Sequence, residues 1–187
     1  MAAVSTLRAT LDDLYREEGK AELIGGRIVR YVASGHLPAT VAEEIFISLH
    51  QHKKTVKRGV AHADGVGYAV DELPSGRESF SPDASTYDGP LPINPMRFIK
   101  GPPTFAAEVR SENDYGNAAE VEMEAKRADY FAAGTLVVWD VDPSAETVAV
   151  YRASAPTVPV IYRRGDTAEA EPAVPDWRMA IDDIFAD

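Results

Sequence analysis

One stretch of the sequence decides what is expected of the core: Thr104-Phe105-Ala106-Ala107-Glu108-Val109-Arg110-Ser111. It is a short apolar run with one carboxylate, Glu108, inside its apolar half. Upstream, Ser81-Pro82-Asp83 places a second carboxylate directly after a proline, within an expected extended segment. A carboxylate in a buried strand costs free energy unless a cation pairs with it. Because two carboxylates on neighbouring strands would repel each other without a metal ion between them, the pattern predicts a metal site at Asp83 and Glu108.

The chemistry of the two side chains favours a hard cation. If their strands are adjacent, alternation along each strand lets both carboxylates point to one place. Oxygen ligands of this kind suit Mg²⁺ or Mn²⁺. The alternative is that Asp83 begins a turn and that Glu108 forms an ion pair with Arg110 or Lys126.

Length and composition predict a single domain over residues 1–187. The chain has no cysteine, which excludes disulfides, thiolate metal sites and cysteine nucleophiles. The first ten residues do not have the pattern of a signal peptide, and no apolar run is long enough to span a bilayer. We therefore expect a cytoplasmic protein with no membrane partner.

The net charge of −11 argues against a nucleic-acid partner, because such proteins usually present a basic face to phosphates. Basic residues are dense only at residues 53–58 and at Arg163-Arg164. A small basic patch on an acidic body is one interpretation, and a bound metal ion would offset part of the acidic charge. The favoured interpretation of residues 53–58 is a solvated helix end whose cations complement the helix dipole.

Hydrophobic periodicity and turn residues predict an α+β fold with an α/β-type core, in which helices flank a mixed sheet. Gly25-Gly26 supplies the turn of a hairpin over residues 21–31, and Gly134 ends a helix. Residues 88–103 are rich in proline and glycine and predict an irregular connection. The expected helices are 10–18, 38–54, 118–133 and 181–185, and the expected strands are 60–70, 78–87, 104–110, 136–141, 147–152 and 158–163.

Lys126 and His36 are the remaining candidates for chemistry. Lys126 lies on the helix after the central strand, where it forms a surface pair with Glu122 or leans toward the carboxylates. In the second case its ammonium would orient an attacking water or stabilise developing negative charge. His36 lies at the start of a helix and is a ligand, an acid/base group or a capping residue; a lone histidine is usually structural.

The order of the motifs resembles the Uma family of restriction-endonuclease-like proteins, in the PD-(D/E)-x-K nuclease superfamily. The resemblance extends from about Leu11 to the chain end. The residues that carry it are Glu22-Leu23-Ile24-Gly25-Gly26-Arg27-Ile28-Val29, His36, Pro82-Asp83, Ala107-Glu108-Val109-x-Ser111, Lys126-x-x-x-Tyr130, Gly134, Trp139-x-Val141-Asp142-Pro143 and Val148-x-Val150-Tyr151-Arg152.

The resemblance implies a restriction-endonuclease-like core, with a mixed four-stranded sheet, flanking helices and added β-hairpins. It implies that Asp83 and Glu108 bind Mg²⁺ or Mn²⁺, with the backbone carbonyl of Val109 as a further ligand. It also implies a metal-dependent endonuclease that hydrolyses phosphodiester bonds, most simply in DNA, and a homo-oligomer such as a dimer.

The same resemblance assigns the supporting residues. The family's lysine is moved from the strand to the following helix, which is where Lys126 lies, and Glu22 and His36 match positions near the catalytic site. Glu44 matches the helix carboxylate of wider relatives. One departure is Arg110, which stands where a superfamily lysine would be and is too basic to exchange a proton.

Two other classes of function fit the same residues. One is a catalytically idle module that binds nucleic acid or protein on a nuclease fold, which Arg110 mildly favours. The other is a structural oligomeric protein whose carboxylates form salt bridges. A fold alone does not fix a function. Measurements of metal binding and of turnover therefore distinguish these classes.

Overall fold

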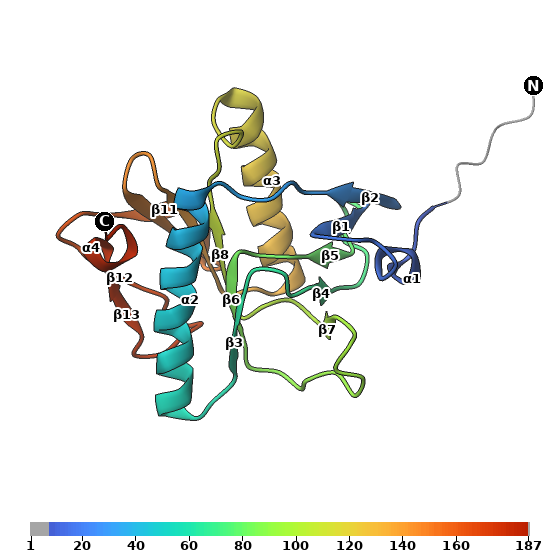
Figure 1. Ribbon diagram of the computed structural model, residues 1–187, viewed down its shortest axis with the longest axis horizontal. Coiled ribbons are helices and arrows are strands. Elements are labelled where there is room, and N and C mark those ends of the chain that lie inside the picture. Colours follow the sequence, from blue (N-terminus) through green and yellow to red (C-terminus); the bar gives the residue numbers. More distant parts are fainter. Residues whose placement is uncertain (1–7, 187) are drawn as a thin grey trace, which may run out of the picture.

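A six-stranded mixed sheet forms the centre of the protein in the computed structural model, which describes residues 8–186 (Figure 1). Only β8 and β9 are parallel; every other neighbouring pair in this sheet is antiparallel. The predicted α+β fold is confirmed. The strands, in their order across the sheet, are β11 (Ala155–Arg163), β10 (Thr147–Arg152), β9 (Val137–Asp142), β8 (Phe105–Val109), β6 (Ala84–Tyr87) and β3 (Val60–Ala63).

Two long helices cover the opposite faces of this sheet, and each packs its own apolar cluster. In Figure 1, α2 (His36–Val56) crosses in front of the sheet and α3 (Asn117–Ala133) lies behind it. The α2 side buries Ile45 and Leu49 against alternate residues of the central strands, such as Trp139. The α3 side buries Tyr130 against the intervening residues. This alternation is the period-two pattern of a sheet that is buried on both faces.

The helix limits follow local sequence signals. The α3 helix ends at Gly134, whose φ of 111° is the left-handed conformation that glycine adopts without a Cβ penalty. The α2 helix begins at His36, two residues before the expected start, so Pro38 falls within its first turn, where a missing N–H costs nothing. The first helix is shorter than predicted: α1 (Leu11–Leu14) follows a Thr10 cap.

Small sheets and helices extend the molecule at its two sides (Figure 1). The predicted hairpin is confirmed, with Glu22 opposite Val29. No helix within residues 8–186 is long and apolar enough to cross a membrane. The remaining elements are β1 (Ala21–Ile24), β2 (Arg27–Arg30), β4 (Tyr68–Ala69), β5 (Ser79–Phe80), β7 (Ile99–Lys100), β12 (Thr167–Glu169), β13 (Arg178–Ala180) and α4 (Ile181–Ile184).

Two expected strands are wrong in extent, because each is divided into two. A turn at Asp64-Gly65, where Gly65 has a φ of 93°, separates β3 from β4. Ser81-Pro82 separates β5 from β6, and proline has no N–H to continue a ladder. Asp83 therefore lies in a bend immediately before β6 and not inside a strand. The main sheet has six strands, where the resemblance implied four, and β4 and β5 belong to a separate small sheet.

Candidate active site

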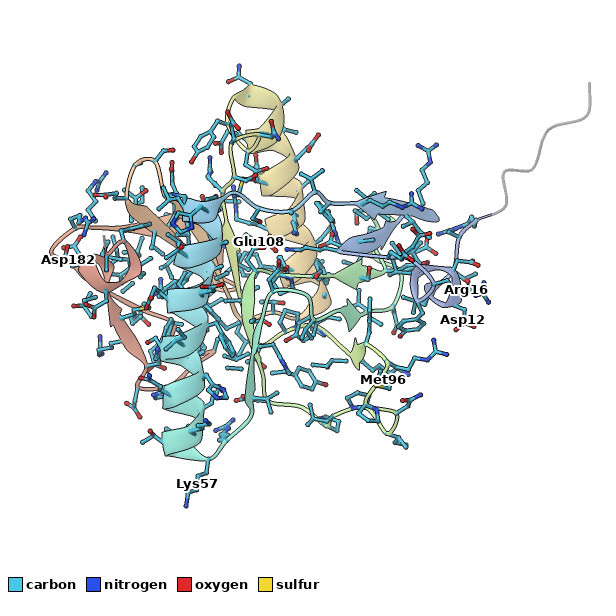
Figure 2. All side chains as sticks on the ribbon, in the orientation of Figure 1. Asp12, Arg16, Lys57, Met96, Glu108 and Asp182 are labelled. Carbon is cyan, nitrogen blue, oxygen red and sulfur yellow. The ribbon has the colours of Figure 1, made fainter. Side chains whose placement is uncertain are left out.

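Asp83 and Glu108 lie side by side because β6 and β8 are neighbours. Ala84 is opposite Ala107 in the antiparallel ladder, and the next step brings Asp83 beside Glu108. The Asp83 N–H donates to the Ala107 carbonyl at 3.1 Å, which continues the pairing past the end of β6. Figure 2 places Glu108 near the middle of the molecule, where β8 and α3 lie next to each other. The two carboxylates that the sequence singled out therefore meet on one face of the sheet.

Asp83 uses its two oxygens for two different kinds of donor. Oδ2 accepts the backbone N–H of Val109 at 2.8 Å, and Oδ1 accepts the Lys20 ammonium at 2.6 Å. Lys20 Nζ also lies 2.8 Å from Asp64 Oδ1. Burial opposes the charge on Lys20, but Asp83 and Glu108 outweigh it and raise its pKa. A neutral donor thus orients Asp83, and a cation occupies its other oxygen.

Glu108 has the same pair of contacts. Oε1 accepts the Tyr130 hydroxyl at 2.5 Å, and Oε2 accepts the Lys126 ammonium at 2.8 Å. The Glu108 side chain is 15% exposed. Burial raises its pKa, and the nearby charge of Asp83 adds to the rise, while Lys126 opposes it. A carboxylate whose charge is only partly compensated in this way is suited to accept a further cation.

Lys126 leans toward the carboxylates and away from the α3 surface, where Glu122 is exposed. Its Nζ is 2.8 Å from Glu108 Oε2 and 3.4 Å from Glu22 Oε1. Burial would lower the pKa of Lys126, but Glu108 and Glu22 outweigh burial and raise it. Lys126 is therefore an ammonium at neutral pH and serves as a hydrogen-bond donor, not as a base.

Glu22 lies next to Glu108 and Lys126, and it has more hydrogen-bond donors than Glu108. Its side chain is fully buried, and it accepts hydrogen bonds from the Ser81 N–H at 2.9 Å, the Tyr31 hydroxyl at 2.9 Å and the guanidinium of Arg77. Arg77 Nε also donates to Asp129 at 2.9 Å. Burial would raise the pKa of Glu22, but Lys126 and Arg77 outweigh burial and lower it.

Sequence reasoning missed Lys20 and Arg77. Lys20 precedes Glu22 by two residues, and alternation along an extended segment would have placed both on one face. Arg77 falls between the expected strands 60–70 and 78–87, where no local pattern distinguishes it from a surface arginine. Its burial depends on the return of the chain to β1, which no local pattern reveals.

The other predicted residues lie outside this cluster. His36 is exposed in the first turn of α2, and within residues 8–186 no hydrogen bond or ion pair joins it to Asp83 or Glu108. Glu44 belongs to α2, which packs on the opposite face of the sheet from Lys126. Arg110 donates to Asp140 at 2.7 Å, so the alternative in which it pairs with Glu108 is wrong. The other form of that alternative is confirmed, because Glu108 forms an ion pair with Lys126 and Asp83 lies in a bend.

The basic stretch 53–58 lies at the end of α2, as expected, and residues 54–58 are exposed. Lys53 is the exception, because it is buried and forms an ion pair with Asp88 at 2.6 Å. Arg164 forms an ion pair with Glu146 at 2.8 Å. Neither stretch presents its full charge to a phosphate backbone.

The carboxylates fit a hard divalent cation. In each carboxylate one oxygen accepts a hydrogen bond from a neutral donor, the Val109 amide or the Tyr130 hydroxyl, and the other accepts one from a lysine ammonium. Within residues 8–186 no three histidine or acidic side chains converge as a ready metal site. A metal ion here would therefore rest on two carboxylates and complete its shell with backbone carbonyl or water oxygens.

Comparisons with known proteins show the family and the fold of this chain. The family model described as "Uma2: Putative restriction endonuclease" matches residues 8–182. A crystal structure titled as a putative nuclease belonging to DUF820, from Anabaena variabilis, superposes with a TM-score of 0.73 at 19% sequence identity. The superposition covers 94% of this chain and 97% of that one, and at this identity it shows the shared fold. No curated protein matches the chain.

Proposed function

Because this chain belongs to the Uma2 family of restriction-endonuclease-like proteins, we propose that it is a metal-dependent endonuclease that hydrolyses phosphodiester bonds in DNA. The observation that carries the proposal is the adjacency of Asp83 and Glu108. Each has one oxygen oriented by a neutral donor and one facing a lysine. A pair of carboxylates can hold a metal ion that activates water, and a nearby ammonium can stabilise the negative charge that develops during phosphodiester hydrolysis.

Asp83 and Glu108 would hold Mg²⁺ or Mn²⁺, with the Val109 carbonyl as a further ligand. The bound ion would supply a water of lowered pKa and would offset negative charge on the phosphate. Lys126 remains protonated, so its ammonium would orient the attacking water or stabilise charge that develops on the phosphorus oxygens. Tyr130 fixes the orientation of Glu108 in this step.

DNA as substrate is part of the proposal, although the net charge of −11 opposes it. Because Lys53 and Arg164 have acidic partners, attraction of phosphate would depend on the exposed Lys54 and Lys57, on the bound metal and on Lys126. A cytoplasmic location and a homo-oligomer stay predictions.

One observation favours the idle binding module as a second candidate. Asp83 and Glu108 already have ammonium partners at hydrogen-bond distance, so their charges are balanced to a large extent without a metal ion. A member of the family that has lost activity would keep the same fold and the same ion pairs. It would bind DNA or a protein without cleaving DNA.

A plasmid-cleavage assay in Mg²⁺ and in Mn²⁺ tests the proposal. We expect wild-type protein to nick supercoiled DNA, and Asp83→Asn and Glu108→Gln to abolish nicking. Lys126→Met should slow nicking by about a hundredfold or more. Glu122→Gln, which removes an exposed carboxylate from the same helix, is the matched control and should cleave normally.

Two results would contradict the proposal. Cleavage that survives in Asp83→Asn and Glu108→Gln would show that the nuclease activity belongs to another site or to a contaminant. DNA binding by the wild type without cleavage in either metal would favour the idle module.

A further inference from the structure

Lys20 has two carboxylate partners, and only one of them belongs to the proposed metal site. It lies directly before β1, and its side chain is 19% exposed. Nζ is 2.6 Å from Asp83 Oδ1 and 2.8 Å from Asp64 Oδ1. The Lys20 ammonium therefore occupies Asp83 Oδ1, which is the oxygen that would otherwise be available to a metal ion.

Asp83 does not depend on Lys20 alone for its position. Its Oδ2 accepts the Val109 N–H at 2.8 Å, and its own N–H donates to the Ala107 carbonyl at 3.1 Å. These two backbone contacts would keep the carboxylate in place if Lys20 moved away. Only the Oδ1 contact would have to be exchanged.

Asp64 offers Lys20 a second position. It lies in the turn after β3, its side chain is 48% exposed, and its Oδ1 also accepts the Gly65 N–H at 2.8 Å. Lys20 could leave Asp83 and remain paired with Asp64 at the edge of the site. Its charge would then be partly solvated and not buried without a partner, which limits the cost of the exchange.

Lys126 has no comparable alternative. It lies between Glu108 and the fully buried Glu22, and its Nζ is 5.6 Å from the centre of the Tyr31 ring. Of the two lysines at the carboxylates, Lys20 is thus the one with a partly exposed carboxylate to move to.

We propose that Lys20 is an internal cation that competes with the divalent metal ion for Asp83, and that Asp64 receives Lys20 when the ion binds. The inference rests on the proposed metal site. In this role Lys20 keeps the acidic pair neutralised before metal binds and sets the metal concentration at which the site fills. It is a positioning residue and need not touch the substrate.

Mn²⁺ titration calorimetry on the whole chain tests this role without any measurement of cleavage. Lys20→Met should bind Mn²⁺ tighter by on the order of tenfold or more, because a unit positive charge a few ångströms from the ion is removed. Lys20→Arg should stay near wild type. Lys54→Met removes an exposed lysine from α2 and is the control for the same change in net charge.

Asp64→Asn should bind Mn²⁺ more weakly, because Lys20 loses its second partner. In the Lys20→Met background the same Asp64→Asn change should have much less effect, since the lysine it acts through is gone. This coupling distinguishes competition by Lys20 from a general effect of charge.

The outcomes separate the two claims. Equal affinity in wild type and Lys20→Met overturns the role of Lys20 and leaves the metal site standing. Mn²⁺ binding by Lys20→Met but not by wild type supports competition by Lys20 in its strongest form. Absence of Mn²⁺ binding in both proteins overturns the role of Lys20 and the metal site together. If Lys20→Met does not fold, wild-type affinity in Asp64→Asn overturns the inference.

Discussion

Glu22 and Glu108 are two buried carboxylates that share one lysine, yet their surroundings differ. Glu22 is fully buried and has the Ser81 N–H, the Tyr31 hydroxyl and Arg77 in addition to Lys126. Glu108 is 15% exposed and has Tyr130 and Lys126, with the negative charge of Asp83 beside it. The pKa of Glu22 is accordingly lowered, and that of Glu108 is raised.

The difference separates a carboxylate with a complete set of donors from one that the proposed function places at a metal ion. Glu22 has enough donors to stay ionised without any ligand, so it can hold Lys126 in place. Glu108 has fewer partners, so its charge is less fully compensated than that of Glu22. Perturbed carboxylates of the second kind are typical of functional sites.

The largest expected effect is the loss of stability when Glu22 loses its partner Arg77. Arg77→Met leaves Glu22 and Asp129 without their guanidinium, and should lower the free energy of unfolding by about 3–5 kcal/mol. Urea denaturation at neutral pH measures it. Arg97→Met breaks an exposed pair with Asp12 and a cation–π contact with Tyr15, and should change stability by no more than about 1 kcal/mol. Equal effects of the two substitutions would show that the Glu22 network is not structural.

A smaller effect is the pH dependence of the two carboxylates, which should have opposite signs. The pKa of Glu22 is below its ordinary 4.5 in the folded protein, so its stabilisation is present above pH 4.5 and is lost as the pH falls through the lowered value. The pKa of Glu108 is above 4.5, so the folded protein binds that proton more tightly. The free energy of unfolding therefore falls as the pH rises from 4.5 through the raised value.

Urea titrations of Glu22→Gln and Glu108→Gln at a series of pH values measure this contrast. The stability advantage of wild type over Glu22→Gln should grow with pH below 4.5, and its advantage over Glu108→Gln should shrink with pH above 4.5. Slopes of the same sign would break the distinction between the two carboxylates.

Local signals predicted much of the fold and the centre of the site. Gly25-Gly26 and Gly134 marked a hairpin and a helix end, and a carboxylate inside an apolar strand marked Glu108. The prediction that Asp83 lies beside Glu108 required only that the expected strands 78–87 and 104–110 be neighbours. Lys20 and Arg77 could not be placed in this way, because their partners are 63 and 55 residues away and are set by tertiary packing.

The smallest expected effect concerns Tyr31, which is one of the hydrogen-bond donors to Glu22. Tyr31→Phe removes one of several partners of Glu22 and should cost about 1 kcal/mol of stability. Burial and then the charge of Glu22 raise the pKa of Tyr31 to about 12. The ultraviolet difference between wild type and Tyr31→Phe should therefore show a tyrosinate that forms near pH 12. Titration near pH 10 would show that Tyr31 is neither buried nor beside Glu22 in solution.

A crystal grown in Mn²⁺ and measured for anomalous scattering tests the central claim most directly. We expect one peak that contacts Asp83 Oδ1 and the Glu108 carboxylate, with Lys20 paired to Asp64 alone and Lys126 still between Glu108 and Glu22. Absence of a peak at millimolar Mn²⁺, with Lys20 still on Asp83, would contradict the metal site and leave these carboxylates as structural ion pairs.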